Sequence, residues 1–327
     1  MLIRAMVGGG IAVGLMGFAQ NALQLTGLRL LQGAASGTVA AATALVASET
    51  PTPNIAWALG VVSSAIALGG AVGPALGGVA AGVFGLRTVF IVGGILLVLA
   101  TLPVLVVVRE SRGRLRQRRD APVLDVLRAA RPGTVAALAM LVVAQLLLQS
   151  SYTAAQQLVV LRVLQLSPSN AATLTGIAFG AAGVVTAFAA VTYARAVRLT
   201  GYRLLTTIAA LVLALAIAGA ALAPSTVLLI GSFVVGSLLY GALIPALTSM
   251  VGLETPASVQ ATVYGVSSGA VALGFGFGPL TGGLIASSRA GVTGGLFASA
   301  AVALALTALL GLRAREPVPL RSAPPGR

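Results

Sequence analysis

A glycine-rich segment occurs twice in this chain, each time inside a long apolar run. The first copy, residues 69–78, reads GGAVGPALGG, and the second, residues 274–283, reads GFGFGPLTGG. The copies lie at an offset of 205 residues (278 − 73), and the same offset places Glu49-Thr50-Pro51 on Glu254-Thr255-Pro256. A repeat of this length in apolar sequence is typical of membrane proteins built from two copies of one helix bundle. The chain is therefore expected to contain two related halves.

Composition places these apolar runs in a membrane. Hydrophobic residues make up 58% of the chain, charged residues make up 8%, and the mean hydropathy is +1.04, whereas a water-soluble domain carries about 25% charged residues. The 41 glycines suit closely packed transmembrane helices. With no cysteine and no histidine, disulfides, thiol nucleophiles and His-ligated metals are excluded. We expect a protein that is not an enzyme and uses no cofactor and no metal.

Ten apolar runs are each long enough, at about 20 residues, to cross a bilayer. They cover residues 6–25, 27–48, 57–83, 87–108, 134–160, 171–194, 204–223, 226–252, 261–287 and 291–312. We expect an all-α, polytopic helical membrane protein. Its expected parts are an N-terminal bundle (1–108), an Arg-rich linker (109–133), a C-terminal six-helix bundle (134–312) and a disordered tail (313–327).

The repeat offset also shows which position of the first half corresponds to the start of the second half. The second half begins near Arg131, and 131 − 205 is −74, so the equivalent start of the first half falls before Met1. We expect twelve spans in two six-helix halves, of which the first two are missing because of a mis-assigned start or a real truncation. The N-terminal apolar run is not interpreted as a signal peptide, because it is longer than an h-region of about 7–15 residues.

Arginines indicate the orientation. They crowd the 109–131 loop, the segment 195–203 and the tail, which share one side if ten helices alternate. The opposite side holds only Arg87, Arg162 and Arg289. The excess of positive charge inside therefore predicts that Met1, the 109–133 loop and the C-terminus are cytoplasmic, in a plasma membrane. The net charge of +14 is thus a topology signal, and we expect no nucleic-acid partner.

Two motifs resemble those of a known family. Leu25-x-x-x-Arg29-x-x-Gln32-Gly33 resembles the fourth-helix motif of major facilitator superfamily transporters, and residues 69–78 resemble the fifth-helix motif of its drug:proton antiporters. The family's GxxxDRxGRR-like loop motif survives in residues 194–203 only as Gly201 and Arg203, without the Asp. The resemblance implies a two-bundle fold, alternating access, protons as coupling ions and export of a small molecule.

The glycines of the repeat have a physical interpretation of their own. Residues spaced by four lie along one helix face, where missing side chains let another helix approach closely, and a proline kinks the helix. This bent seam can serve as a gate between bundles or as ordinary helix packing, and ordinary packing is favoured for the second copy. The candidate gating and packing residues are Gly69, Gly73, Pro74, Gly77, Gly78, Gly274, Gly278, Pro279, Gly282 and Gly283.

Arg29 is the one charged residue clearly inside an apolar run, which costs several kcal/mol unless the side chain finds protein, water or a partner. The resemblance implies that Arg29, with Gln32, takes part in proton coupling opposite a buried carboxylate. No Asp or Glu of this chain lies deep in a span, so that acid is expected on the missing helices. The alternative is an arginine that snorkels to the outer interface.

A polar stripe runs along the span at 134–160. Gln145, Gln149, Tyr152 and Gln156 follow a helical spacing, and by resemblance Ser237 and Tyr240 lie on the opposing helix. Uncharged amide and phenol groups suit a broad pocket for apolar or cationic compounds. These six residues are therefore substrate-cavity candidates, and the alternative is that the glutamines hydrogen-bond neighbouring helices.

Glu49 and Glu254 end equivalent helices at the expected cytoplasmic face. Each could pair with loop arginines as a gate, or could simply be a solvated helix-end charge, because exposed ion pairs contribute little. Taken together, the sequence favours a monomeric, bilayer-embedded drug or metabolite exporter driven by proton antiport. Two alternatives stay open: an importer or facilitator of the same superfamily, and a truncated fragment that does not transport.

Overall fold

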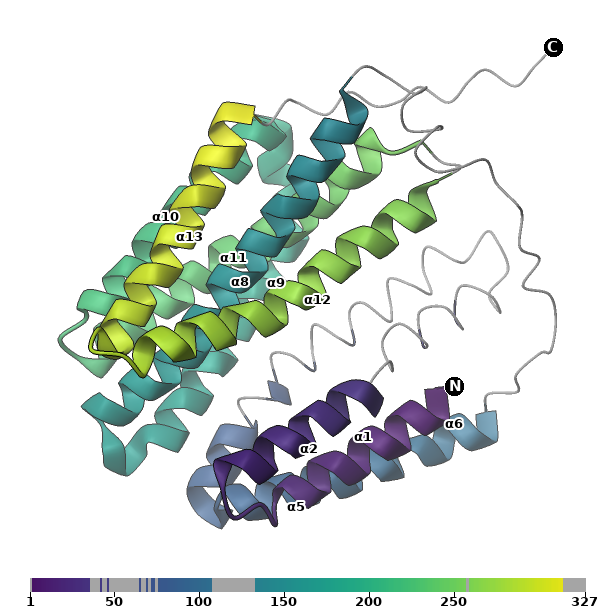
Figure 1. The fold of residues 1–327 in the computed structure, drawn as a ribbon, viewed down its shortest axis with the longest axis vertical. Coiled ribbons are helices and arrows are strands. Elements are labelled where there is room, and N and C mark those ends of the chain that lie inside the picture. The colour runs from purple at the N-terminus through teal and green to yellow at the C-terminus, as the bar shows by residue number, and fades with distance from the viewer. Residues whose placement is uncertain are drawn as a thin grey trace. The chain divides into compact units, whose positions relative to one another are not determined.

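The computed structural model describes residues 2–35, 76–107, 133–256 and 259–313, together with the single positions 42, 46, 65, 69, 72 and 73. Its contacts divide the chain into two compact units. Unit 1 comprises residues 1–117 with 172–180, and unit 2 comprises residues 118–171 with 181–327. The described parts of both units are helical (Figure 1).

In unit 1 the described helices are α1 (Leu2–Met16), α2 (Ala22–Ala35), α5 (Leu86–Leu99) and α6 (Thr101–Val107). Residues 76–84 are also helical. The interruption between α5 and α6 has a local cause, because Pro103 has no N–H to donate to the carbonyl of Leu99.

Helices α1 and α5 pack through glycines. A Cβ built at Gly94 would lie 2.5 Å from the nitrogen of Gly14 and 2.6 Å from the carbonyl oxygen of Gly10, so the two backbones are nearly in contact. Gly10 faces Val98, and Gly17 faces Ile91. Because these positions pair in reverse order, the two helices are antiparallel.

The expected first span, 6–25, is wrong in its bounds. Helix α1 ends at Met16 and α2 begins at Ala22, so a turn divides the apolar run. The reason is a capping arrangement at the start of α2. The side-chain oxygen of Asn21 accepts from the N–H of Gln24 at 2.8 Å, and the Gln24 side chain accepts from the N–H of Gln20 at 2.8 Å. Asn followed three residues later by Gln is a helix-start signal.

Six long helices lie in unit 2, except that residues 172–180 of the second of them, α9, belong to unit 1. They are α8 (Thr134–Leu166), α9 (Ala171–Thr200), α10 (Tyr202–Leu222), α11 (Thr226–Glu254), α12 (Gln260–Ala286) and α13 (Gly291–Arg313), with a short 3-10 turn η2 (Pro168–Asn170) after α8. Their starts lie within two residues of the predicted ones. Helix α8 runs six residues beyond its predicted end, to Leu166, and stops before Ser167-Pro168, because the residue before a proline avoids the helical conformation.

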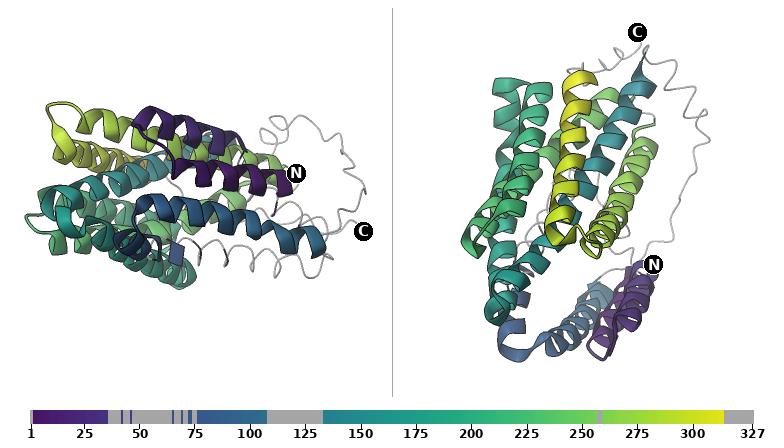
Figure 2. Two further views of the ribbon diagram at one scale, coloured as in Figure 1. Left: turned by 90° about the horizontal axis from the view of Figure 1, so that it is seen from below. Right: turned by 60° about the vertical axis from the view of Figure 1, so that its left-hand side comes forward.

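Within unit 2, α8 packs against α12, α13 and α11, and α10 packs against α11 and α13; Figure 2 shows these helices from two further sides. Glycines with a positive φ allow sharp turns between consecutive helices at Gly201 (φ 79°), before α10, and at Gly291 (φ 63°), before α13.

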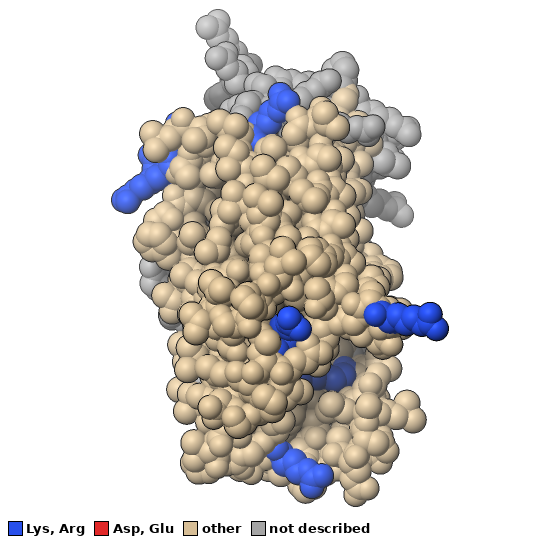
Figure 3. Space-filling view, turned by 90° about the vertical axis from the view of Figure 1, so that its left-hand side faces the viewer, with Lys and Arg blue, Asp and Glu red and all other residues tan. Residues whose placement is uncertain are grey.

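Seven helical segments among the described residues are long and apolar enough to cross a membrane, and Ile3–Met16 is a shorter apolar helix. Their outer side chains are largely hydrophobic, including Val191 (82% exposed) and Val227 (80% exposed). On the face drawn in Figure 3, arginines are scattered singly over an uncharged surface. Such a surface fits hydrocarbon rather than water, and the chain is a multi-pass membrane protein.

A candidate ligand-contact cluster on helices α8 and α11

The polar stripe of α8 turns into the interior of unit 2 over most of its length. Gln145 (5% exposed), Gln149 (2%) and Tyr152 (8%) are buried. Gln156, one turn further on, is half-buried, and its neighbour Gln157 is exposed. Three residues of the predicted stripe therefore share one buried face, and the fourth, Gln156, lies at the edge of the bundle.

Two hydrogen bonds join Gln149 and Tyr152 to α11. The phenol of Tyr240 donates to Oε1 of Gln149 at 2.9 Å. The phenol of Tyr152 lies 3.0 Å from Oγ of Ser237. Because the Ser237 hydroxyl donates to the carbonyl of Phe233 at 2.7 Å, its oxygen is the acceptor for Tyr152. Both phenol protons are thus used within the pair of helices.

The same residues form an aromatic stack. The rings of Tyr152 and Tyr240 lie 3.7 Å apart between centroids and are inclined by only 9°. Phe233 extends the stack, with its centroid 6.1 Å from that of Tyr152. Stacked aromatic pairs contribute roughly 0.5–1.5 kcal/mol beyond the area that they bury. The four candidates Gln149, Tyr152, Ser237 and Tyr240, together with Phe233, are called the α8–α11 cluster below.

Gln145 belongs to a neighbouring polar contact. Its Oε1 accepts from the hydroxyl of Ser267 on α12, and its Nε2 donates to Oγ1 of Thr248 on α11 at 3.5 Å. The structure thus ties Gln145 to two helices of unit 2. Whether Gln145 also contacts a substrate stays a prediction.

One donor group in the α8–α11 cluster has no acceptor. Nε2 of Gln149 is buried and makes no hydrogen bond to any described group. Exchanging the two ends of the amide would leave Oε1, one N–H and the Tyr240 hydroxyl proton unpaired, so the orientation with Oε1 towards Tyr240 satisfies more groups. A buried amide without its partners costs roughly 1–3 kcal/mol. Such a group calls for an explanation.

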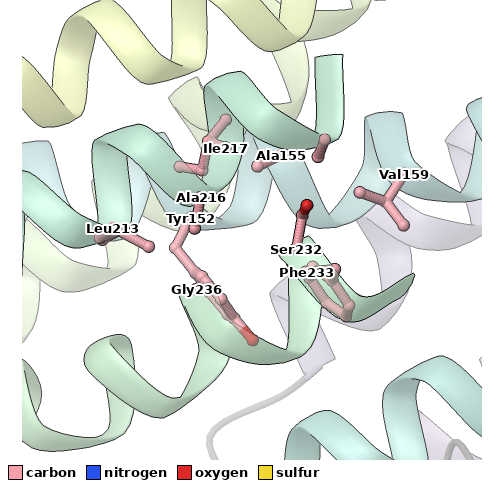
Figure 4. A pocket seen from close by; sticks show the side chains of 10 residues that line it. Tyr152, Ala155, Val159, Leu213, Ala216, Ile217, Ser232, Phe233 and Gly236 are labelled. Atoms are coloured by element: carbon pink, nitrogen blue, oxygen red, sulfur yellow. The ribbon is translucent and has the colours of Figure 1, made fainter. Parts of the chain in front are cut away.

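A small cavity lies next to the cluster, between α8, α10 and α11 (Figure 4). Its volume is about 10 Å³, which is close to the least that holds one water molecule. Tyr152, Phe233 and Ser232 line it together with aliphatic groups such as Leu213 and Ile217. The packing of α11 against α8 and α10 is therefore incomplete at this level.

The second glycine motif positions α8 from the other side. A Cβ at Gly274 would lie 2.6 Å from Cβ of Gln149, and one at Gly282 would lie 3.2 Å from Cβ of Ala154. At Gly278 it would overlap the carbonyl oxygen of Ser150 and Oγ1 of Thr153. That threonine donates to the carbonyls of Gln149 at 2.7 Å and Gly274 at 3.2 Å. These three glycines form a close packing seam between α12 and α8.

Two members of this motif are not among the three glycines of the seam. Pro279 is half-buried within α12, and no described atom lies within 4 Å of a Cβ at Gly283.

Four of the ten residues of the first glycine motif lie outside the described residues, and Pro74 is one of them. No described atom lies within 4 Å of a Cβ built at Gly69, Gly73 or Gly77. Within unit 1, a Cβ at Gly78 would overlap the backbone of Gly176. A gating role for this copy stays a prediction.

Arg29 and Gln32 lie together on α2. Nη1 of Arg29 donates to Oε1 of Gln32 at 3.0 Å, and its guanidinium lies 5.8 Å from the ring centroid of Phe90 on α5. Arg29 is exposed in unit 1. The structure brings the two predicted coupling residues into contact, and their role in coupling stays a prediction.

Glu254 is the last residue of α11 and is half-buried. Glu49 and the arginines of the 109–131 loop lie outside the described residues, so the proposed gate stays a prediction.

Sequence reasoning missed three contributors. Phe233 completes the stack, Ser267 is the partner of Gln145, and Thr186 on α9 donates to the carbonyl of Ser237 at 2.9 Å. Phe233 and Ser237 are four residues apart on one helix face, which could have suggested the first. The sequence has no comparable signal for Ser267 or Thr186.

The long apolar helices and the repeated glycine motif define a polytopic helical membrane protein. The model of the Major Facilitator Superfamily matches residues 1–266 and again 161–327, and the chain belongs to this superfamily.

Among relatives, the chain is similar to a multi-drug resistance efflux pump PmrA homologue of Lactococcus lactis subsp. lactis (strain IL1403). The two are 40% identical over 111 residues, which is 34% of this chain and 27% of that protein. It is also similar to the multidrug resistance protein MdtG of Proteus mirabilis (strain HI4320), with 40% identity over 111 residues, 34% of this chain and 28% of that protein. The matched region thus spans between a quarter and a third of these relatives.

Among solved structures, the fold is similar to that of a bacterial homologue of the human lysosomal transporter Spinster in an inward-facing, unoccupied conformation. The TM-score is 0.69 at 17% identity, over 99% of this chain and 84% of that one. The occupied inward-facing form gives a TM-score of 0.69 at 18% identity, over 95% of this chain and 81% of that one.

Proposed function

We propose that the protein exports small, mostly apolar or cationic compounds in exchange for protons, with its two bundles alternating access to a central site. The observation that carries the proposal is the 40% identity with two proteins named for multidrug efflux or multidrug resistance. The uncharged, aromatic α8–α11 cluster supports it, because apolar surface with a few polar groups suits varied small molecules.

Arg29 and Gln32 are the proposed coupling residues. An arginine inside an apolar region is costly and therefore suggests a function. Its contacts with Gln32 and Phe90 hold the guanidinium near α5 while leaving it exposed in unit 1. In this position it can interact with a carboxylate that gains and loses a proton during transport.

Dye uptake into inverted membrane vesicles tests direction and coupling together. An exporter driven by protons accumulates dye when the vesicle lumen is made acidic and stops when a protonophore collapses the gradient. We expect Arg29→Ala to lower this uptake about tenfold, corresponding to about 1.4 kcal/mol. Arg87→Ala is the matched control, because Arg87 is another exposed arginine of unit 1 with no proposed role. Undiminished uptake by Arg29→Ala would refute the coupling role, and gradient-driven loss of dye would indicate an importer.

A further inference from the structure

The unpaired amide of Gln149 restricts which compounds the α8–α11 cluster can favour. We infer that Gln149 is a specificity-determining residue whose Nε2 donates to a carbonyl or ether oxygen of an uncharged aromatic substrate. The inference rests on the proposed function and deepens it, by selecting acceptor-bearing neutral compounds from the broader apolar and cationic class.

The first step of the argument is a count of donors and acceptors. Within the cluster, the phenol of Tyr240 donates to Gln149, the phenol of Tyr152 donates to Ser237, and Ser237 donates to a backbone carbonyl. Every side-chain hydroxyl proton therefore has an acceptor. The two N–H groups of Gln149 have none among the described residues. The cluster has a surplus of donors, and a surplus of donors is complementary to an acceptor.

The second step concerns charge. The chain has six acidic residues, and Glu254 alone lies in the described helices. It is 14 residues after Tyr240 on α11, or about 21 Å along the helix axis. A buried cation needs a carboxylate or a similar partner. The described part of the cluster offers amide, phenol and hydroxyl groups instead, so it favours an uncharged ligand.

The third step concerns access. Pro245 lies within α11 and cannot donate to the carbonyl of Gly241, which directly follows Tyr240. The helix is thereby weakened next to the stack. The cavity of about 10 Å³ lined by Tyr152 and Phe233 shows that packing beside the stack is already incomplete. A displacement of α11 at this point separates Tyr240 from Tyr152 and opens the cluster to an aromatic ring, with Gln149 at its edge.

Photolabelling of the purified full-length chain in lipid nanodiscs tests the inference. The probe is benzophenone, an uncharged diaryl ketone that cross-links on illumination. The competitor is diphenylmethane, which has the same two rings and lacks the oxygen. We expect benzophenone to label α8 or α11. The protein should prefer benzophenone over diphenylmethane by about two- to tenfold in affinity, which is the contribution of one net hydrogen bond.

Three variants separate the amide donor from general damage. Gln149→Leu removes the donor and should reduce the preference to about onefold. Gln149→Met keeps the length of the side chain but has no hydrogen-bond donor, so it should lose the preference too. Gln157→Leu, an exposed glutamine on the same helix, should behave as the unaltered protein. The melting temperature of each variant shows whether it is folded.

Labelling elsewhere, no labelling, or a preference that survives both Gln149 substitutions would overturn the inference. The binding assay uses no pH gradient, so it is independent of coupling and direction. A protein that binds ketones through Gln149 but fails in the vesicle assay would contradict the proposed function alone. A protein that transports dyes with no dependence on Gln149 in the photolabelling would contradict this inference alone.

Discussion

The seam between α12 and α8 gives a sharp test of the packing, because two glycines of α12 that are two residues apart have opposite surroundings. A Cβ at Gly278 would overlap the Ser150 carbonyl oxygen and lie 3.1 Å from the nitrogen of Ala154, whereas no described atom lies within 4 Å of a Cβ at Gly276. Backbone atoms in the middle of a helix cannot move away as a flexible side-chain end can.

The magnitudes follow from these contacts. Replacing a helical glycine by alanine stabilises by roughly 0.5–1 kcal/mol when the space is open, and this is the expectation for Gly276→Ala. Overpacking costs roughly 1–3 kcal/mol, and the backbone contacts place Gly278→Ala at the upper end, for a net loss of about 2 kcal/mol. The two variants should therefore differ by about 3 kcal/mol in stability.

Thermal unfolding followed by fluorescence-detected size-exclusion chromatography measures this difference without function. At about 2–4 °C per kcal/mol for a domain of this size, the melting temperatures of the two variants should differ by about 6–12 °C. Equal melting temperatures, or a less stable Gly276→Ala, would refute the assignment of Gly278 to the seam.

Two further substitutions test other contacts. Gly94→Ala should lower the melting temperature, because its Cβ would lie 2.5 Å from the nitrogen of Gly14, while the adjacent Gly93→Ala, 4.0 Å from Val13, should not; the same thermal assay compares them. Tyr240→Phe should lower the stability by roughly 1–3 kcal/mol, because it leaves both polar atoms of Gln149 unpaired. Tyr193→Phe, which loses a half-buried hydrogen bond to Ser249, should lower the stability less. An equal loss of stability in the two variants would count against the α8–α11 cluster.

The sequence predicted the helices of unit 2 well because each is a long apolar run bounded by a strong local signal. Helix α8 starts at Thr134, directly after Gly133, and helix α9 starts at Ala171, directly after the Pro168–Asn170 turn. The turn after Met16 was predicted too late in the chain, at the end of the 6–25 run, because the surrounding residues are apolar enough to hide its position in a hydropathy average. The capping pair Asn21 and Gln24 marked it, which shows that polar detail decides boundaries that hydropathy leaves open.

The site was predictable only in part, for a physical reason. Helical periodicity identified the buried face of Gln145, Gln149 and Tyr152, because periodicity is a property of one helix. The stack on Tyr240 and the bond from Ser267 depend on how far neighbouring helices are shifted along one another. That shift is set by packing over the whole length of each pair, and no short stretch of sequence encodes it.

Helix α8 is held more firmly by α12 on one side than by α11 on the other. Towards α12, the glycine seam brings backbone against backbone, and Thr153 bridges the two helices through its bonds to Gln149 and Gly274. Towards α11, contact is made by side chains, beside a cavity of about 10 Å³ and a proline-weakened turn. Backbone contacts cannot adjust by changing rotamers, whereas stacked rings and an amide can. When unit 2 changes conformation, α8 and α12 should therefore move as one body, and α11 should be the helix that shifts against it.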